Sequence, residues 1–366
     1  LSCEEGENGW LVELDRTIFY PTGGGQPCDT GTLGGADVTE TLLRGETVLH
    51  RCTAALPVGA DVTGEIDWAR RLDLMQQHSG EHLVSGLIHA RFGYENVGFH
   101  LGADLVTIDF NGEVDEQALQ ELERAANEAV WADFAPHIWY PEPDELAHLP
   151  YRSKKALTGA VRLVQFGDID LCACCGTHVA RTGEIGLIKL FSTTHFRGGS
   201  RIEMACGGRA LAVLNALCAQ NRDISVRLSA KPVQTAAAVA RFASERTEAQ
   251  QRAAALEDRL FALLAQDGQT LRFEPPMPPE SVRRLADAMV RANGARCAVF
   301  AGQDGAWHYA MADRDGDLRG LTKRLNAALQ GRGGGKPGFV QGSLAASRTD
   351  IEAFFTAESC STPDQA

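Results

Sequence analysis

Two histidines and a later cysteine-rich stretch are the residues of this chain best suited to chemistry. His78 and His82 lie four residues apart, inside a stretch that predicts a long helix. Side chains four apart share one helix face, so both imidazoles can reach a single ion. Cys172-Ala173-Cys174-Cys175-Gly176-Thr177-His178 adds thiolates and another imidazole. Cysteine mixed with histidine suits zinc better than magnesium or calcium.

The spacing leaves alternatives open. A histidine pair alone is equally typical of two partly buried histidines with ordinary hydrogen bonds, and it is the clustered cysteines that favour zinc. Either Cys174 or Cys175 could supply the thiolate. The same helix also matches the H-x-x-E-H pattern of certain zinc peptidases, with Glu81 as the base that activates water. That reading leaves the cysteine cluster unused.

Length and composition indicate a soluble globular protein of two or three domains. At 366 residues the chain exceeds the size of most single cores. It has no apolar run of the roughly 18 residues needed for a membrane span, so we expect no membrane association. Ten cysteines in so long a chain are unlike a secreted disulfide framework. We therefore expect reduced thiols and a cytoplasmic location.

Charge is distributed unevenly along the chain. The net charge is −13, but residues 1–207 hold 15 basic and 31 acidic side chains, whereas residues 208–366 hold 20 and 17. Residues 318–349 contain no acid at all. This stretch predicts a local positive surface that could bind a nucleic-acid backbone, although a solvated charged face would look the same. The basic residues proposed to bind RNA are Lys323, Arg324, Arg332 and Lys336.

The elements that must position these residues fall into four predicted segments. Residues 1–66 alternate apolar and polar residues between glycine turns, which predicts a small β-barrel. Residues 67–207 open with a helix over 68–91, preceded by Asp67 as its N-cap and ended by Gly93, and then mix strands and helices. Gly80 and Gly86 inside that helix suggest the close approach of another backbone or a substrate.

The second half of the chain changes composition. Residues 208–273 predict long helices with a break at Pro232 and a thin apolar seam, typical of a helical arm or short coiled coil. Residues 274–279 are proline-rich and predict a stiff linker, and residues 274–366 predict a small α/β domain. The fold class expected is thus α+β with several domains.

Two glycine-rich stretches bear on binding. The loop over residues 19–27 contains Gly24, Gly25 and Gln26, and it could bring backbone amides close to a ligand or simply form a tight turn. Residues 331–337 are not a nucleotide-binding P-loop, because position 330 is Gln and Lys336 is followed by Pro. We expect there a mobile loop that contacts a nucleic-acid backbone.

Together these motifs resemble the freestanding alanyl-tRNA editing proteins of the long AlaX type, which are similar to the editing and C-terminal domains of alanyl-tRNA synthetase. The resemblance runs nearly end to end. It depends on residues 14–31, 75–82, 97–102, 174–186, 201–203 and 333–342. It implies a small β-barrel, an editing domain shared with threonyl-tRNA synthetases, helices and a C-terminal domain. It also implies zinc held by His78, His82, Cys174 and His178, and substrate contacts from Gly24, Gly25, Gln26, His100 and Thr177.

The function expected from this resemblance is trans-editing: hydrolysis of the ester of tRNA(Ala) mischarged with serine, and with glycine as a second candidate. A pocket for a small apolar side chain cannot strongly reject an analogue that adds only a hydroxyl, so a second hydrolytic site is the physical remedy. Glu81 is the candidate catalytic base. The alternatives are a tRNA-binding accessory protein with a structural zinc, and a metallopeptidase. We also expect a homodimer through the helical arm or the C-terminal domain.

Overall fold

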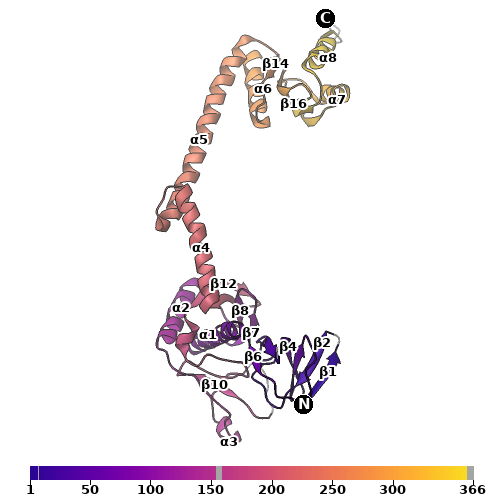
Figure 1. Ribbon diagram of the computed structural model, residues 1–366. Helices are drawn as coiled ribbons and strands as arrows, with labels where there is room; N and C mark the ends of the chain where they lie inside the picture. The colour runs from indigo at the N-terminus through magenta and orange to yellow at the C-terminus, as the bar shows by residue number, and fades with distance from the viewer. Residues whose placement is uncertain (7, 154–158, 361–366) are drawn as a thin grey trace. The chain divides into compact units, whose positions relative to one another are not determined.

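The chain folds into two compact units, Leu1–Asp223 and Ile224–Ala366 (Figure 1). The structure is a computed structural model that describes residues 1–6, 8–153 and 159–360. Both units mix helices with sheets, as the α+β prediction requires. No helix in the described part of the chain is long and apolar enough to cross a lipid bilayer.

The first unit begins with a six-stranded antiparallel sheet of order β1-β2-β5-β4-β3-β6. Val12, Phe19, Leu33 and Val38 are buried in its core. β1 and β6 are the two edge strands, and within the described residues they do not pair with each other, so the predicted closed barrel is not confirmed. The strands are β1 (Ser2–Gly6), β2 (Gly9–Glu13), β3 (Gly31–Leu33), β4 (Ala36–Arg44), β5 (Thr47–Cys52) and β6 (Gly64–Ile66).

Helix α1 (Trp68–Phe92) carries both histidines and lies where the sequence predicts it. The Asp67 side chain accepts a hydrogen bond from the backbone amide of Arg70, 3.1 Å away, as an N-cap does. Gly93 ends the helix with a positive φ of 70°, a conformation that glycine adopts without steric cost. The two internal glycines are close-contact points. A Cβ on Gly80 would collide with the Cys206 side chain, and one on Gly86 with the Ile169 backbone.

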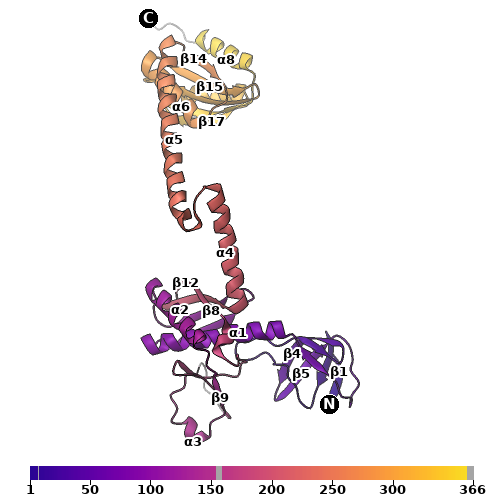
Figure 2. The same ribbon diagram turned by 60° about the vertical axis from the view of Figure 1, so that its left-hand side comes forward.

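Helices α1 and α2 (Glu116–Trp131) pack on a four-stranded sheet of order β12-β13-β8-β7 (Figure 2). Val84 and Ile88 of α1 share this core with Leu122 of α2 and Ile108 of the sheet. The rigid layer under α1 fixes the position of its histidines. The strands are β7 (Asn96–Leu101), β8 (Val106–Phe110), β12 (Ile188–Phe196) and β13 (Gly199–Cys206).

A smaller antiparallel sheet, of order β11-β10-β9, brings the cysteine-rich stretch to α1. Its strands are β9 (His137–Trp139), β10 (Leu163–Phe166) and β11 (Asp170–Ala173), and Cys174 follows directly after β11. Phe166 of β10 lies in the same core as the apolar face of α1. The short helix α3 (Pro143–Leu146) and the 3-10 turn Thr182–Ile185 complete this region, and α4 (Gly207–Arg227) follows β13.

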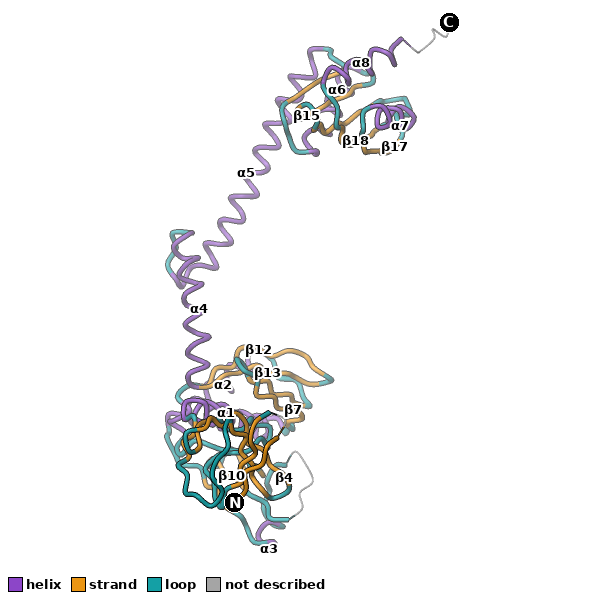
Figure 3. The backbone as a smooth tube through the Cα atoms, turned by 45° about the vertical axis from the view of Figure 1, so that its right-hand side comes forward, coloured by secondary structure: helices purple, strands orange, loops and turns teal. Residues whose placement is uncertain are grey.

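The second unit is built on a five-stranded sheet of order β14-β15-β16-β18-β17 (Figure 3). The β14–β15 pair is parallel and the other pairs are antiparallel. One core joins Phe261 of α5 to α6, and the other joins Leu325 of α7 and Ile351 of α8 to the sheet. The elements are α5 (Thr235–Leu264), β14 (Leu271–Glu274), α6 (Pro279–Asn293), β15 (Cys297–Gln303), β16 (Ala306–Ala312), α7 (Arg319–Ala328), β17 (Arg332–Lys336), β18 (Phe339–Leu344) and α8 (Arg348–Cys360).

Two expectations for this unit differ from the structure. The proline-rich residues 274–279 are not a linker between domains, because β14 before them pairs with β15 and α6 after them packs on the same sheet. The glycine run near residue 333 is not a loop but the edge strand β17, which pairs with β18. Its glycines are needed for packing: a Cβ on Gly333 would collide with the Tyr309 hydroxyl and the Gln341 carbonyl. The domain boundaries predicted after residues 66, 207 and 273 remain predictions.

Candidate metal centre

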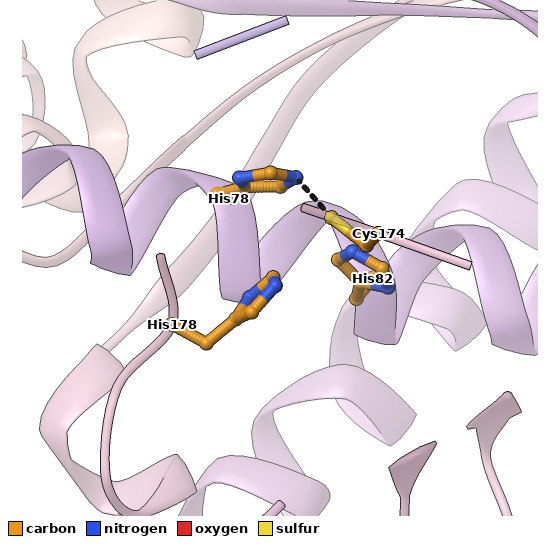
Figure 4. A group of neighbouring side chains, drawn as sticks. All are labelled: His78, His82, Cys174 and His178. Atoms are coloured by element: carbon orange, nitrogen blue, oxygen red, sulfur yellow. Dashed lines mark hydrogen bonds between the residues drawn. The ribbon is translucent and has the colours of Figure 1, made fainter. Parts of the chain in front are cut away.

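Four side chains from two segments converge beside α1 (Figure 4). His78 and His82 project from successive turns of the helix, with ring centroids 5.3 Å apart. Cys174 and His178 come from the segment after β11. One potential ligand atom from each residue lies within 4.8 Å of the others. The structure thus gathers the four residues that the resemblance implied and places Cys174, rather than the exposed Cys175, in the group.

One donor atom of this group lacks the hydrogen-bond partner that it would need without an ion. The Nε2 atom of His178 is buried and has no hydrogen-bond partner among the described residues. The Sγ atom of Cys174 lies 3.4 Å from Nε2 of His78. A buried polar atom without a partner is costly. Three imidazoles and a thiol are a donor set that fits tetrahedral zinc, so the residues present fit that ion.

The electrostatics of Cys174 and His178 favour the protonation states that bind a cation. Burial opposes ionisation of the Cys174 thiol, but His78 and the neighbouring imidazoles outweigh it and hold the pKa well below the usual 9.0. Burial lowers the pKa of His178 to about 3, so this ring is neutral near pH 7. A thiolate beside a neutral imidazole is the ligating form of both groups. For His82, burial is outweighed by Asp170 and Cys174, which raise the pKa well above the usual 6.5, so this ring must give up a proton when it binds an ion.

Gln26 of the N-terminal glycine loop connects that loop to the centre. Its Oε1 lies 2.9 Å from Nδ1 of His78 and accepts a hydrogen bond of 3.1 Å from the Thr177 amide. Its Nε2 donates to Oγ1 of Thr177 at 2.6 Å. With the proton on Nδ1, the Nε2 atom of His78 is free to bind an ion. Gly24 lies next to Gly176. A side chain on Gly176 would collide with His78.

Three further residues touch the centre that sequence reasoning did not single out. Asp170 Oδ2 lies 2.7 Å from Nδ1 of His82. Ser79 Oγ lies 3.4 Å from Nδ1 of His178 and accepts from the Val179 amide at 3.1 Å. Phe99 stacks on His78 with centroids 5.5 Å apart. Asp170 precedes Cys174 by four residues. This closeness in sequence to the cysteine motif was the one signal that could have indicated a role for Asp170 at the centre.

The other predicted substrate contacts and the candidate base are placed as follows. A Cβ on Gly25 would press on Phe99, so this glycine lies against the ring that stacks on His78. His100 is exposed, next to Phe99 on β7. Glu81 is buried and belongs to neither group of potential metal ligands. Its Oε1 accepts hydrogen bonds from Ser85 at 2.7 Å and from Asn96 at 2.5 Å.

The four predicted RNA contacts are exposed on one part of the second unit. Lys323 and Arg324 lie on α7, and Arg332 and Lys336 are the end residues of β17, which contacts α7. Arg324 forms a two-bond ion pair with Glu358 at 2.9 and 2.6 Å. Its charge is therefore partly neutralised within the unit.

Known families match both ends of the first unit. Residues 161–203 match the threonyl and alanyl tRNA synthetase second additional domain, and residues 1–70 match the class II (A) tRNA synthetases. The alanyl-tRNA editing protein Aarsd1 of Danio rerio is 26% identical over 98% of this chain and 91% of its own length. This chain is similar to the alanyl-tRNA editing proteins. The resemblance predicted from the motifs is thereby confirmed.

Two further relatives extend the comparison. The editing protein AlaX-L of Pyrococcus horikoshii is 33% identical over 56% of this chain and 53% of its own length. The alanine-tRNA ligase of Pyrococcus abyssi is 30% identical over 92% of this chain, which spans only 39% of the ligase. Among solved structures, the C-Ala domain of Aquifex aeolicus alanyl-tRNA synthetase matches 24% of this chain and 87% of its own, with 18% identity and a TM-score of 0.22. That likeness is too slight to bear on the fold.

Proposed function

We propose that this chain is an aminoacyl-tRNA deacylase that hydrolyses the ester of mischarged tRNA(Ala) in the cytoplasm. Serine is the proposed misplaced amino acid and glycine the second. The observation that carries the proposal is the group of His78, His82, Cys174 and His178, which Gln26 ties to a glycine loop able to present backbone amides. The names of the two editing relatives support the same activity.

The chain's own residues would bind and orient the substrate. The loop of Gly24 and Gly25 lies beside Gly176 and Phe99, so the glycine loop and the cysteine segment form one surface next to the donors. The Thr177 side chain is held by Gln26 on this surface. Zinc bound by the four residues would act as a Lewis acid on the ester or hold the amino group of the substrate.

A tRNA-binding accessory protein with a structural zinc is the second candidate. A shell of four protein donors is typical of structural zinc, whereas a catalytic site usually keeps one position open. The metallopeptidase has less support. Its pattern requires a carboxylate as the third ligand, but the group contains Cys174 and His178 in that place.

We further propose that the second unit captures the tRNA and that the chain forms a homodimer. Capture is supported by the exposed cations of α7 and β17, since the acidic first half of the chain has little to attract a polyanion. The dimer is supported by two groups of exposed apolar residues of α5, spaced by three or four within each group, which a second copy could cover. These are Val239, Phe242, Leu256, Leu260 and Leu263. Sedimentation equilibrium would test the dimer.

The deciding experiment incubates the chain with Ser-tRNA(Ala), Gly-tRNA(Ala) and Ala-tRNA(Ala) and measures the ester that survives. We expect rapid loss of the serine ester, measurable loss of the glycine ester and survival of the correct alanine ester. Survival of all three, together with binding of the tRNA, would instead support the accessory protein. Cleavage of a peptide library in the same preparation would support the peptidase.

A further inference from the structure

We propose that Asp170 and Arg152 form a positioning pair that fixes the His82 ring in its ligating orientation. The Asp170 carboxylate divides its two oxygens between two partners. Oδ2 lies 2.7 Å from Nδ1 of His82, and Oδ1 accepts from Nε and Nη2 of Arg152, both at 2.8 Å. The inference rests on the metal centre proposed above and names two residues that act through a ligand.

The burial of all three side chains makes this arrangement specific. The side chains of Asp170, Arg152 and His82 are 1%, 10% and 3% exposed. A buried carboxylate without a counter-charge is strongly unfavourable, and the Arg152 guanidinium supplies that counter-charge. Because the guanidinium occupies Oδ1, the acceptor left for His82 is Oδ2.

Backbone hydrogen bonds hold Arg152 in place. Its amide donates to the Leu171 carbonyl at 2.8 Å, and its carbonyl accepts from the Ala173 amide at 2.9 Å. Arg152 also forms an isolated parallel bridge with Cys172. The guanidinium is thus anchored to the strand that leads to Cys174, so a shift of this strand would move Asp170 and Arg152 together.

The consequence for His82 is a single tautomer. An ionised carboxylate can only accept, so the proton lies on Nδ1 and the lone pair on Nε2 points to the other donors. A carboxylate that accepts from the far nitrogen of a ligating histidine fixes the ring and raises its basicity. Without Asp170 the ring would be free to rotate or to adopt the tautomer that cannot bind through Nε2.

A competing arrangement uses Asp170 itself as a ligand. His82, Asp170 and Cys172 also lie close enough to share an ion, with ligand atoms within 4.8 Å. Arg152 argues against this arrangement, because a cation bound at the carboxylate would lie next to a guanidinium that already bonds Oδ1. The structure therefore favours positioning, and the experiment separates the two arrangements.

The test measures zinc affinity of the full chain by competition with a chromophoric chelator, and records the absorption spectrum of the cobalt-substituted protein. We expect Asp170→Asn to weaken zinc binding about 10–100-fold while one ion still binds. The thiolate-to-cobalt band should persist, because Cys174 is untouched. Arg152→Gln should weaken zinc binding as well, and Arg152→Lys should recover part of the loss.

Controls keep the outcomes distinct. Asp168→Asn, an exposed carboxylate two residues from Asp170, should leave zinc affinity unchanged. If the parent chain binds no zinc, the proposed metal centre fails. If the parent binds zinc but Asp170→Asn and Arg152→Gln match it within about twofold, the positioning pair alone is wrong. If Asp170→Asn unfolds by circular dichroism, Arg152→Gln decides by itself. If the cobalt-substituted Cys172→Ser variant loses the thiolate-to-cobalt band, the ion is bound instead by His82, Asp170 and Cys172.

Discussion

Replacing Gln26 by alanine should damage the metal centre although Gln26 is not a ligand. The change removes the acceptor of His78 Nδ1 and of the Thr177 amide, and the donor to Thr177 Oγ1. Gln26 is 1% exposed, so no bulk water takes its place without rearrangement. We expect Gln26→Ala to fold, to bind zinc more weakly and to hydrolyse Ser-tRNA(Ala) more slowly.

The magnitude follows from the groups left unpaired. The donor on His78 is fully buried and the Thr177 amide is partly buried. Leaving both donors without an acceptor should lower the free energy of unfolding by about 2–4 kcal/mol. Removing the group that orients a ligating histidine typically costs about 10–100-fold in metal affinity. The glycine loop would also lose its tie to Thr177, so the Michaelis constant should rise while the catalytic rate falls.

Three measurements check this prediction: urea unfolding, zinc competition and single-turnover hydrolysis. Gln165→Ala is the matched control, since its amide donates one bond to the Gly167 carbonyl at an exposed position. Such surface changes usually stay within about 0.5 kcal/mol. If Gln26→Ala matches Gln165→Ala in stability, zinc affinity and hydrolysis rate, the glycine loop does not support the metal centre.

Glu81→Gln should keep its zinc and lose less than the roughly 10²–10⁴-fold in rate typical of a general base, and a loss in that range would make Glu81 the base after all. Burial holds the pKa of His50 below its usual 6.5, so only the unfolded chain takes up this proton as the pH falls below about 6.5. Stability should therefore drop by at most about 1.4 kcal/mol per pH unit there, and urea unfolding of His50→Gln should show a shallower fall. The four exposed cations of the second unit are Lys323, Arg324, Arg332 and Lys336. Neutralising all four should weaken tRNA(Ala) binding and reduce the slope of log affinity against log salt by up to about 0.7–0.9 per lost phosphate contact. Unchanged binding in a filter-retention assay would contradict the capture proposal.

Local signals predicted α1 and the common face of its two histidines well. Asp67 and Gly93 marked the ends of α1 because caps depend on a few adjacent residues. The histidine spacing is likewise a property of one helix. The choice of Cys174 over Cys175 required the resemblance, since either spacing permits a ligand. The structure supports Cys174, which belongs to the group of possible ligands, whereas Cys175 is exposed.

What the sequence did not predict depends on distant contacts. Asp170 and Phe99 reach the centre through strand pairing and packing that no local pattern encodes. The glycine run of β17 was interpreted as a loop because glycine is a poor strand former, but its lack of side chains is what permits close contact with Tyr309 and β18. β3 is only three residues long, too short for a periodic signal.

The mechanism proposed for this chain requires zinc held through Cys174 for hydrolysis of the mischarged ester. The most direct test follows decay of Ser-tRNA(Ala) with the parent chain, Cys174→Ala and Cys175→Ala, each before chelation, after chelation and after zinc is returned. We expect the parent and Cys175→Ala to contain one zinc, to lose activity with the ion and to regain it. Cys174→Ala should contain little zinc and stay inactive throughout. Full hydrolysis by the chelated parent, or an equal loss in Cys175→Ala, would contradict this mechanism.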